Sequence, residues 1–278
     1  MGPENDKGSK LKTTRHVILL LDIQGYKDLI LNSDEDSILQ SFDEIVESVK
    51  STLGGLNDIN NMMQMRMYSD NFLIYSELTG DAVYDHMMTD LILKFGALIQ
   101  SKLMIDLGLM SRGSVCIGKM YQNETYVYGS GLVEAYEMES GHKMPMIVVS
   151  SEIIDILQNT ETYPGDINNS IEYTMPITTS KEGVFVDYLK IYLWCVVKEA
   201  HDSGNKNKIH DPIIYHKIAV ENKLIPRCKD ACLRKKDNAE FVERMKNKIE
   251  WVIQYHNDKS DLPWFPDDLK IDSTLVDI

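Results

Sequence analysis

Two aspartates at the ends of apolar segments are the residues of this chain best placed to do chemistry. Asp22 closes the apolar run 16–21, and Asp70 lies in a Ser-Asp-Asn turn between two further apolar runs. A carboxylate at the end of a buried strand is costly to bury unless it is paired or binds a cation. Two such carboxylates predict a divalent-metal site of the kind that handles nucleotide phosphates.

The elements that must position these aspartates predict an α+β fold. The hydrophobic patterns predict, in chain order, a strand (16–21), helices (25–31 and from 34), a hairpin (62–68 and 72–76), a helix (81–105), strands (110–121 and 126–128), a helix (132–139), a strand (145–150), a helix (151–157), a loop (159–182) and one or two strands (183–195). This order fits a mainly antiparallel, ferredoxin-like sheet with helices on one face.

Composition divides the chain into three parts. Residues 1–14 are polar and non-periodic, which predicts a disordered lead-in, and residues 15–200 hold the predicted sheet domain. Residues 201–278 are predicted to form a helical extension packed on the core. Between 205 and 250 this extension has 12 Lys and Arg against 7 Asp and Glu, a pattern more typical of a solvated helix face than of a partner site.

The bulk composition argues against several classes of protein. A net charge of −14 and a pI near 4.9 are unsuited to general nucleic-acid or anionic-membrane binding, since both need a positive surface. No apolar run can span a bilayer, so we expect a soluble, cytoplasmic protein. Cys228 and Cys232, one helical turn apart, leave open a zinc-stapled interaction protein, although no second Cys or His pair has finger-like spacing.

Four motifs between residues 16 and 150 together resemble class III nucleotidyl cyclases. The motif Asp22-Ile-Gln-Gly-Tyr26 is similar to the DIxGF signature of that family, and Arg66-Met-Tyr-Ser-Asp70 is similar to its KxxGD segment. The segment Arg112-Gly-Ser-Val-Cys-Ile-Gly118 resembles RxGIxxG. The stretch 128–138 lies where the family carries FGxxVNxAxRM. Each motif alone is weak, but four in the right order are fairly specific.

The resemblance implies a role for several of these residues. Asp22 and Asp70 would hold two Mg²⁺ or Mn²⁺ ions, with the Ile23 carbonyl as a further contact. Arg112 matches an arginine that contacts phosphate, and so completes the implied catalytic set of Asp22, Asp70 and Arg112. Cyclases of this class are head-to-tail homodimers, so the metal pair of one protomer would face base-reading residues of the other.

The departures from the family pattern concern base recognition and transition-state stabilisation. Arg66 and Tyr126 stand where adenylate cyclases carry the Lys and Asp that read adenine, and Tyr68 flanks the metal turn beside them. Val133 and Glu137 replace the Asn and Arg that normally steady the transition state. The chain is therefore either a divergent cyclase or an inactive, nucleotide-binding regulatory module with the same fold.

The helix over 131–139 followed by Pro-Met-Ile-Val-Val at 145–149 resembles the bacterial pyrimidine cyclases of Pycsar anti-phage defence, although Met146 stands where that branch usually has Arg. This resemblance implies that UTP is converted to 3′,5′-cyclic UMP, a messenger for a separate cyclic-nucleotide-sensing effector. CTP conversion to cyclic CMP is the near alternative. An arginine at position 66 slightly favours uracil, which offers two carbonyl acceptors.

Overall fold

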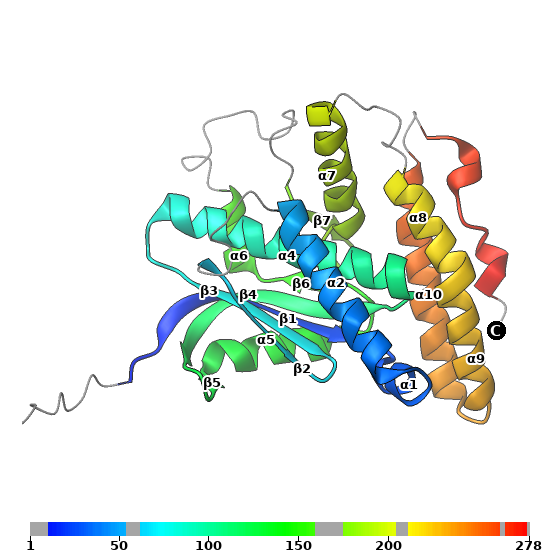
Figure 1. The fold of residues 1–278 in the computed structure, drawn as a ribbon, viewed down its shortest axis with the longest axis horizontal. Helices are drawn as coiled ribbons and strands as arrows, with labels where there is room; N and C mark the ends of the chain where they lie inside the picture. Colours follow the sequence, from blue (N-terminus) through cyan, green and yellow to red (C-terminus); the bar gives the residue numbers. More distant parts are fainter. Residues whose placement is uncertain (1–10, 54–61, 159–174, 204–210, 262–264, 277–278) are drawn as a thin grey trace, which may run out of the picture.

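One mixed sheet of eight strands runs through the middle of the molecule (Figure 1). The computed structural model describes residues 11–53, 62–158, 175–203, 211–261 and 265–276. The strands lie in the order β2-β3-β1-β4-β6-β8-β7, with β5 paired to β4 off this path. They are β1 (Thr14–Ile23), β2 (Gln64–Tyr68), β3 (Asn71–Glu77), β4 (Ser111–Gln122), β5 (Val127–Tyr128), β6 (Ile147–Val149), β7 (Ile177–Ser180) and β8 (Gly183–Val186).

The first four strands have the ferredoxin-like arrangement that the sequence predicts. β1 pairs antiparallel with both β3 and β4, and β2 pairs antiparallel with β3. The one parallel pairing joins β4 to β6 across helix α5 (Ser130–Gly141). The predicted α+β class is therefore confirmed, and β1 lies inside the sheet between β3 and β4, where its C-terminal end can reach residues from both strands.

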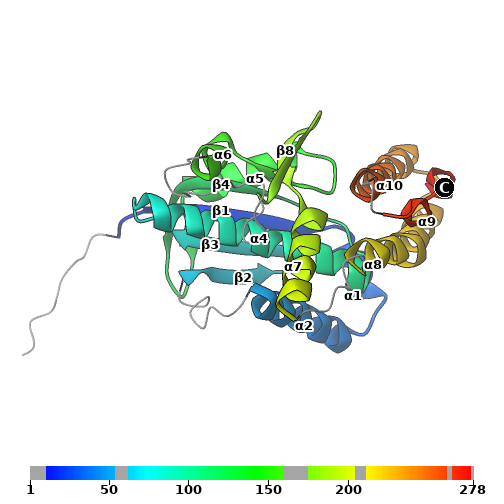
Figure 2. The same ribbon diagram turned by 90° about the horizontal axis from the view of Figure 1, so that it is seen from above.

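Most helices before residue 200 cover one face of the sheet. Helices α2 (Glu35–Leu53), α4 (Ala82–Leu107) and α6 (Ser151–Gln158) share a single apolar core with alternate residues of β1, among them Val17, Leu19 and Leu21. Figure 2 shows α4 lying along the sheet in the middle of this layer. The Asp81 side chain caps α4 by accepting a hydrogen bond from the Tyr84 backbone N–H.

Helix α5 covers the other face, an addition to the predicted layer of helices on one face. It packs on β1 and β4 over a smaller core that includes Ile18, Cys116 and Ala135. Two glycines permit this close approach, because a Cβ added at Gly118 would lie 2.3 Å from the Gly131 Cα. The close approach brings the C-terminal half of α5 beside the start of β4.

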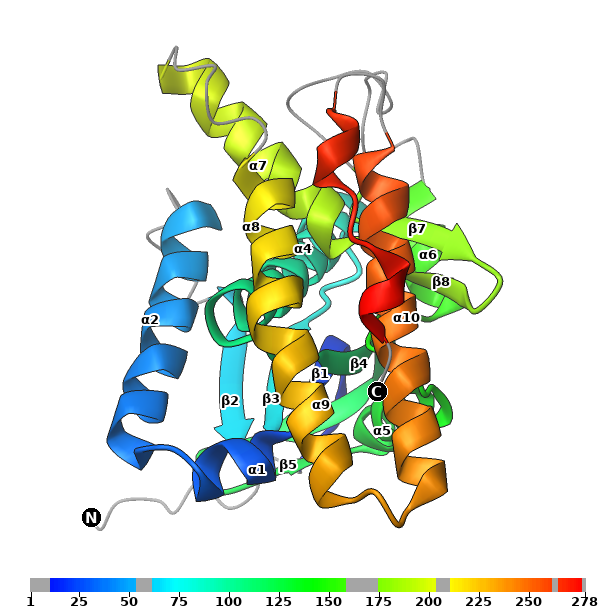
Figure 3. The same ribbon diagram turned by 90° about the vertical axis from the view of Figure 1, so that its right-hand side faces the viewer.

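The C-terminal part of the chain forms a group of helices that lie together beside the sheet (Figure 3). They are α7 (Tyr188–Ser203), α8 (Asp211–Ala219), a π-helical turn (Val220–Leu224), α9 (Ile225–Arg234) and α10 (Ala239–Ser260). Pro226 in the first turn of α9 has no N–H to donate to the preceding turn, which explains the wider π-helical hydrogen bonding there. A second apolar core joins the π-helical turn, α9 and α10 to Met104 and Met110 near the end of α4, whereas α7 and α8 pack into the main core.

Several sequence-based boundaries need correction. The predicted strands over 183–195 end at Val186, and the rest of that segment begins α7, because a nearly continuous apolar run does not distinguish a strand from a buried helix. The predicted loop over 159–182 contains β7, while 159–174 lie outside the described residues, as do 1–10 of the predicted lead-in. The division at residue 200 falls inside α7. In the described part of the chain, no helix is long and apolar enough to cross a membrane.

Candidate active site

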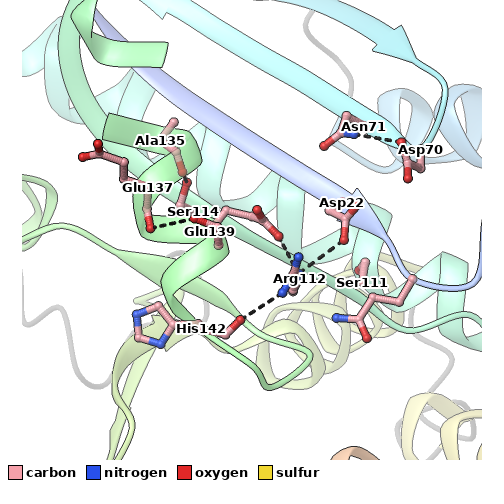
Figure 4. Close-up of polar contacts among 12 residues, drawn as sticks. Asp22, Asp70, Asn71, Ser111, Arg112, Ser114, Ala135, Glu137, Glu139 and His142 are labelled. Carbon is pink, nitrogen blue, oxygen red and sulfur yellow. Dashed lines mark hydrogen bonds and ion pairs between the residues drawn. The ribbon is translucent and has the colours of Figure 1, made fainter. Parts of the chain in front are cut away.

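The fold brings Asp22 and Asp70 to one end of the sheet (Figure 4). Asp22 lies between Asn71 of β3 and Arg112 of β4 in the strand register. The Ile23 backbone N–H donates a 2.7 Å hydrogen bond to the Asp70 carbonyl, which fixes the β2–β3 turn against the end of β1. The Asn71 side-chain amide donates to Asp70 Oδ1 at 2.9 Å and orients that carboxylate.

Two backbone conformations shape the loops that carry these aspartates. Ser69, directly before Asp70, has a φ of 54°, a left-handed conformation that is uncommon outside glycine. Ser69 stands where the KxxGD pattern has its glycine. A left-handed conformation at this position explains why the pattern has glycine there. Gly25 has a φ of 81° and turns the chain from β1 into the short helix α1 (Tyr26–Leu31).

Arg112 joins the end of β1 to helix α5. Its Nε lies 3.3 Å from Asp22 Oδ2 and 2.5 Å from Glu139 Oε1, and its Nη1 donates to the His142 carbonyl at 3.1 Å. The side chain of Glu139 is 5% exposed, whereas that of Arg112 is 28% exposed. Sequence reasoning missed Glu139 as a site residue. The available signal is a glutamate on the side of α5 that is buried against the sheet.

Burial controls the electrostatics of both carboxylates that contact Arg112. The pKa of Asp22 is raised above its ordinary value chiefly because burial disfavours the charged form, and the nearby charge of Asp70 raises it further. Burial likewise raises the pKa of Glu139. The Arg112 guanidinium opposes both shifts. A cation placed between Asp22 and Asp70 would relieve the same repulsion.

The donor set at this end of the sheet fits a hard divalent cation. Carboxylate and carbonyl oxygens are the ligands of Mg²⁺ and Mn²⁺, and Asp22, Ile23 and Asp70 line one cleft. Across the described segments, no cluster of three or more His, Cys, Asp or Glu side chains could hold a metal by itself. A pair of carboxylates that leaves the remaining positions to substrate phosphates and water is the usual arrangement for Mg²⁺ at nucleotide sites.

The cleft in front of Asp22 and Asp70 has a volume of about 600 Å³. One side is formed by the ends of β1 and β4 and by the β2–β3 turn, and the other side by α9 and α10. Lys248 of α10 donates a 2.6 Å hydrogen bond to Gln24 Oε1, so the C-terminal helices contact the loop that follows Asp22 directly. The basic residues of these helices are the second group that sequence reasoning did not assign to the site.

The predicted substrate-binding residues lie elsewhere in the same protomer. Arg66 pairs across the ladder with Leu73, which belongs to the core on the α5 side of the sheet, and its Nη2 donates to the Asn123 carbonyl at 2.5 Å. Tyr126, 45% exposed, donates its backbone N–H to the Asn123 side chain, and Tyr68 is 50% exposed. A hydrogen bond with Tyr68 is the main cause of a raised Arg66 pKa. None of Arg66, Tyr68 and Tyr126 lines the cleft.

The remaining candidate residues contribute little to this site. Val133 and Glu137 are exposed on α5. Cys228 and Cys232 are buried in α9, where burial raises the pKa of the Cys228 thiol to about 12. A zinc ligand must be a thiolate, so this environment disfavours the zinc-stapled alternative.

Comparisons with known proteins find structural overlap without sequence similarity. No protein-family model and no curated protein matches the chain. The adenylyl cyclase CyaB from P. aeruginosa overlaps at 12% identity over 53% of this chain and 82% of that one, with a TM-score of 0.41.

Two further solved structures overlap to a similar degree. The monomeric guanylyl cyclase domain of the RhoGC fusion protein from the aquatic fungus Blastocladiella emersonii does so at 10% identity over 63% and 94% of the two chains, with a TM-score of 0.42. A class III adenylyl cyclase-like ATP-binding protein from Pseudomonas aeruginosa does so at 12% identity over 55% of this chain and 37% of that one, with a TM-score of 0.37. Overlap this low leaves the function to be argued from the site itself.

Proposed function

We propose that this protein is a metal-dependent nucleotidyl cyclase that converts a pyrimidine nucleoside triphosphate into a 3′,5′-cyclic monophosphate and pyrophosphate. UTP is the favoured substrate and CTP the alternative. The observation that carries the proposal is the meeting of Asp22 and Asp70 at the end of β1, facing a cleft with basic side chains on its other wall. The four cyclase-like motifs, which lie in the family's order, add to it.

In the proposed reaction, the two aspartates hold the metals and Arg112 contacts the phosphates. Asp22, Asp70 and the Ile23 carbonyl would bind two Mg²⁺ or Mn²⁺ ions, which lower the pKa of the attacking 3′-hydroxyl and offset the charge of the departing pyrophosphate. Arg112 contacts both Asp22 and Glu139, so a metal ion that takes over Asp22 would release part of the guanidinium to donate to a phosphate oxygen. Val133 and Glu137 cannot donate hydrogen bonds to the transition state as Asn and Arg do. The metal ions and Arg112 must therefore stabilise more of its negative charge.

The base would be read by a second copy of the chain. Arg66, Tyr68 and Tyr126 lie together but away from the cleft, which is the separation that a head-to-tail homodimer with shared sites requires. Arg66 uses N–H groups for the Asn123 carbonyl and for Tyr68, and the guanidinium N–H groups that are left could donate to the carbonyl oxygens of uracil. We further propose that the cyclic nucleotide signals to a separate effector in phage defence, which rests on the resemblance to Pycsar cyclases.

The direct test is turnover of each nucleoside triphosphate by the purified protein with Mn²⁺, with products separated by chromatography. We expect cyclic UMP as the main product, and Asp70→Ala should reduce its formation to background because the metals lose a ligand. Asp36→Ala, at an exposed position of α2, is the matched control and should retain full activity. A cyclic purine as the main product would contradict the proposed specificity.

A nucleotide-binding regulatory module is the second candidate, favoured by Val133 and Glu137 at the positions of the usual catalytic Asn and Arg. Equilibrium dialysis with labelled UTP and Mg²⁺ separates the two. Tight UTP binding without product from any nucleoside triphosphate would identify the module and exclude the enzyme.

A further inference from the structure

The basic wall of the cleft comes largely from the C-terminal helices. Eight Lys and Arg residues line the cleft against four Asp and Glu, although the whole chain has a net charge of −14. Five of these eight lie on α9, α10 and their connection, namely Arg227, Arg234, Lys235, Arg244 and Lys248. Such a concentration of positive charge in an acidic protein indicates a site for an anion.

In the described part of the chain, three of these cations form no ion pair with a carboxylate. Among the described residues, neither Arg227 nor Arg244 forms an ion pair, and the Lys248 ammonium donates to the neutral Gln24 side chain. Burial, and after it the positive charges of Arg112 and Arg244, lower the pKa of Lys248 to about 8. Like charges held this close repel one another, so binding an anion between them is favourable.

The helices that carry these cations are fixed in place before any ligand binds. Ile249 and Ile253 of α10 pack into the second apolar core with Met104 and Met110. Arg244 and Lys248 are four residues apart and therefore lie on one side of α10, where both line the cleft. Arg234 of α9 lies 3.6 Å from Asp28, which ties the far end of the helix pair to α1.

From this arrangement we propose that α9 and α10 bind the triphosphate of the substrate through Arg227, Arg244 and Lys248, on the same protomer as Asp22 and Asp70. The inference rests on the proposed function and assigns a role to the extension that follows residue 200. A cleft of about 600 Å³ is within the usual range for small-molecule sites. Carboxylates on one wall can hold the metal ions, while guanidinium and ammonium groups on the other donate to phosphate oxygens.

Binding of inorganic tripolyphosphate with Mg²⁺ to the full chain, measured by isothermal titration calorimetry, tests the phosphate site without the base. The double variant Arg244→Gln/Lys248→Gln should raise the dissociation constant about 10- to 100-fold, the usual effect of losing charge-assisted hydrogen bonds. Lys229→Gln/Lys246→Gln removes the same charge from α9 and α10 outside the cleft and should change it less than about 3-fold. Arg244→Lys/Lys248→Arg keeps both charges and should restore most of the affinity.

Repeating the titration with UTP and CTP separates this inference from the proposed function. The glutamine pair should weaken both nucleotides by a similar factor and leave their ratio unchanged, because it acts on phosphate and not on the base. Wild-type affinity for tripolyphosphate in the glutamine pair would overturn the inference even if the protein makes cyclic UMP. If the glutamine pair weakens tripolyphosphate binding but the wild type makes no cyclic nucleotide, the phosphate site stands and the cyclase proposal is rejected. Circular dichroism of each variant checks folding. If the variant Arg244→Gln/Lys248→Gln does not fold, Arg227→Gln is measured in its place.

Discussion

Arg112 lies between two carboxylates that are distant from it in sequence, Asp22 on β1 and Glu139 on α5. Removing one partner of such a pair leaves the other charge in a poorly solvated position, which costs more than the pair itself contributes. Glu139 is almost fully buried, so its carboxylate depends on Arg112 for compensation. We therefore assign Glu139 as a positioning residue that holds the Arg112 guanidinium near the end of β1.

Replacing Glu139 with Gln should lower the free energy of unfolding by about 2–4 kcal/mol, because Arg112 loses a buried counter-charge. Chemical denaturation measures the effect, and Glu137→Gln, an exposed change on the same helix, should stay within about 0.5 kcal/mol of wild type. In a double-mutant cycle with Arg112→Gln, we expect a coupling energy above about 1 kcal/mol. Additive effects of the two changes would show that Glu139 does not act on Arg112.

Among the elements, α7, α8 and α10 are joined by a chain of buried hydrogen bonds. His256 Nε2 lies 2.9 Å from the Leu269 carbonyl, so this nitrogen must carry a proton, and its Nδ1 then accepts from His216 Nδ1 at 3.0 Å. His216 Nε2 in turn accepts from the Tyr188 hydroxyl at 2.9 Å. This assignment has both histidines neutral, the form that burial favours by lowering the pKa of each, and it gives each one defined tautomer.

This chain of hydrogen bonds should make the fold sensitive to acid. Burial is the main cause of a lowered pKa at both histidines, and the positive charge of His256 would add to it at His216. Below the ordinary value of 6.5 the unfolded chain binds protons that the fold excludes, so the free energy of unfolding should decrease with falling pH. Each histidine contributes a slope of at most about 1.4 kcal/mol per pH unit, and the full stabilisation is present above pH 6.5.

Urea denaturation between pH 5 and 8 measures this dependence on the wild type and on His216→Gln. The variant should be less stable at pH 8 and should lose much of the pH slope. His142→Gln, a half-buried histidine after α5 that is outside the hydrogen-bonded chain, should keep the wild-type slope. Equal slopes in all three proteins would mean that other groups cause the acid sensitivity.

In the whole molecule, the two halves of the proposed site lie in different places. Asp22, Asp70 and the cations of α9 and α10 line the cleft, whereas Arg66 and Tyr126 lie near the β4–β5 turn. Since neither Arg66 nor Tyr126 lines the cleft, the proposed function needs these residues from a second copy. A symmetric homodimer solves the problem by completing each site with residues from both copies.

Mixed dimers test this arrangement. Arg66→Ala and Asp70→Ala should each be nearly inactive alone, while a heterodimer of the two, purified by separate tags, should recover up to about half of the wild-type activity per dimer because one of its two sites is intact. Adding Lys248→Gln to the Asp70→Ala chain should leave this recovery unchanged. Adding it to the Arg66→Ala chain should reduce the recovery, since Lys248 acts beside the aspartates of its own chain. A fully active monomer in sedimentation would contradict the shared site.

The sequence by itself determined the α+β class and the location of Asp22 and Asp70 at the same end of the sheet. Both depend on local patterns, namely strand alternation and a two-residue polar turn, which record which face of an element is buried. The positions of the long helix α4 and of the β2–β3 hairpin follow for the same reason. The strand-to-helix change at Tyr188 could not be predicted, because a nearly uniform apolar segment has no period to read.

Only the tertiary structure decided what surrounds those aspartates. Glu139 and Lys248 lie far from Asp22 in sequence, and their place in the site depends on two packing events: the glycine crossing of α5 on β4 and the burial of α10 against the end of α4. The positive charge between 205 and 250 has the sequence pattern of an ordinary solvated helix face. The sequence pattern shows which side of α10 is apolar, but it does not show what that side packs against, and the packing decides which way the charged side faces.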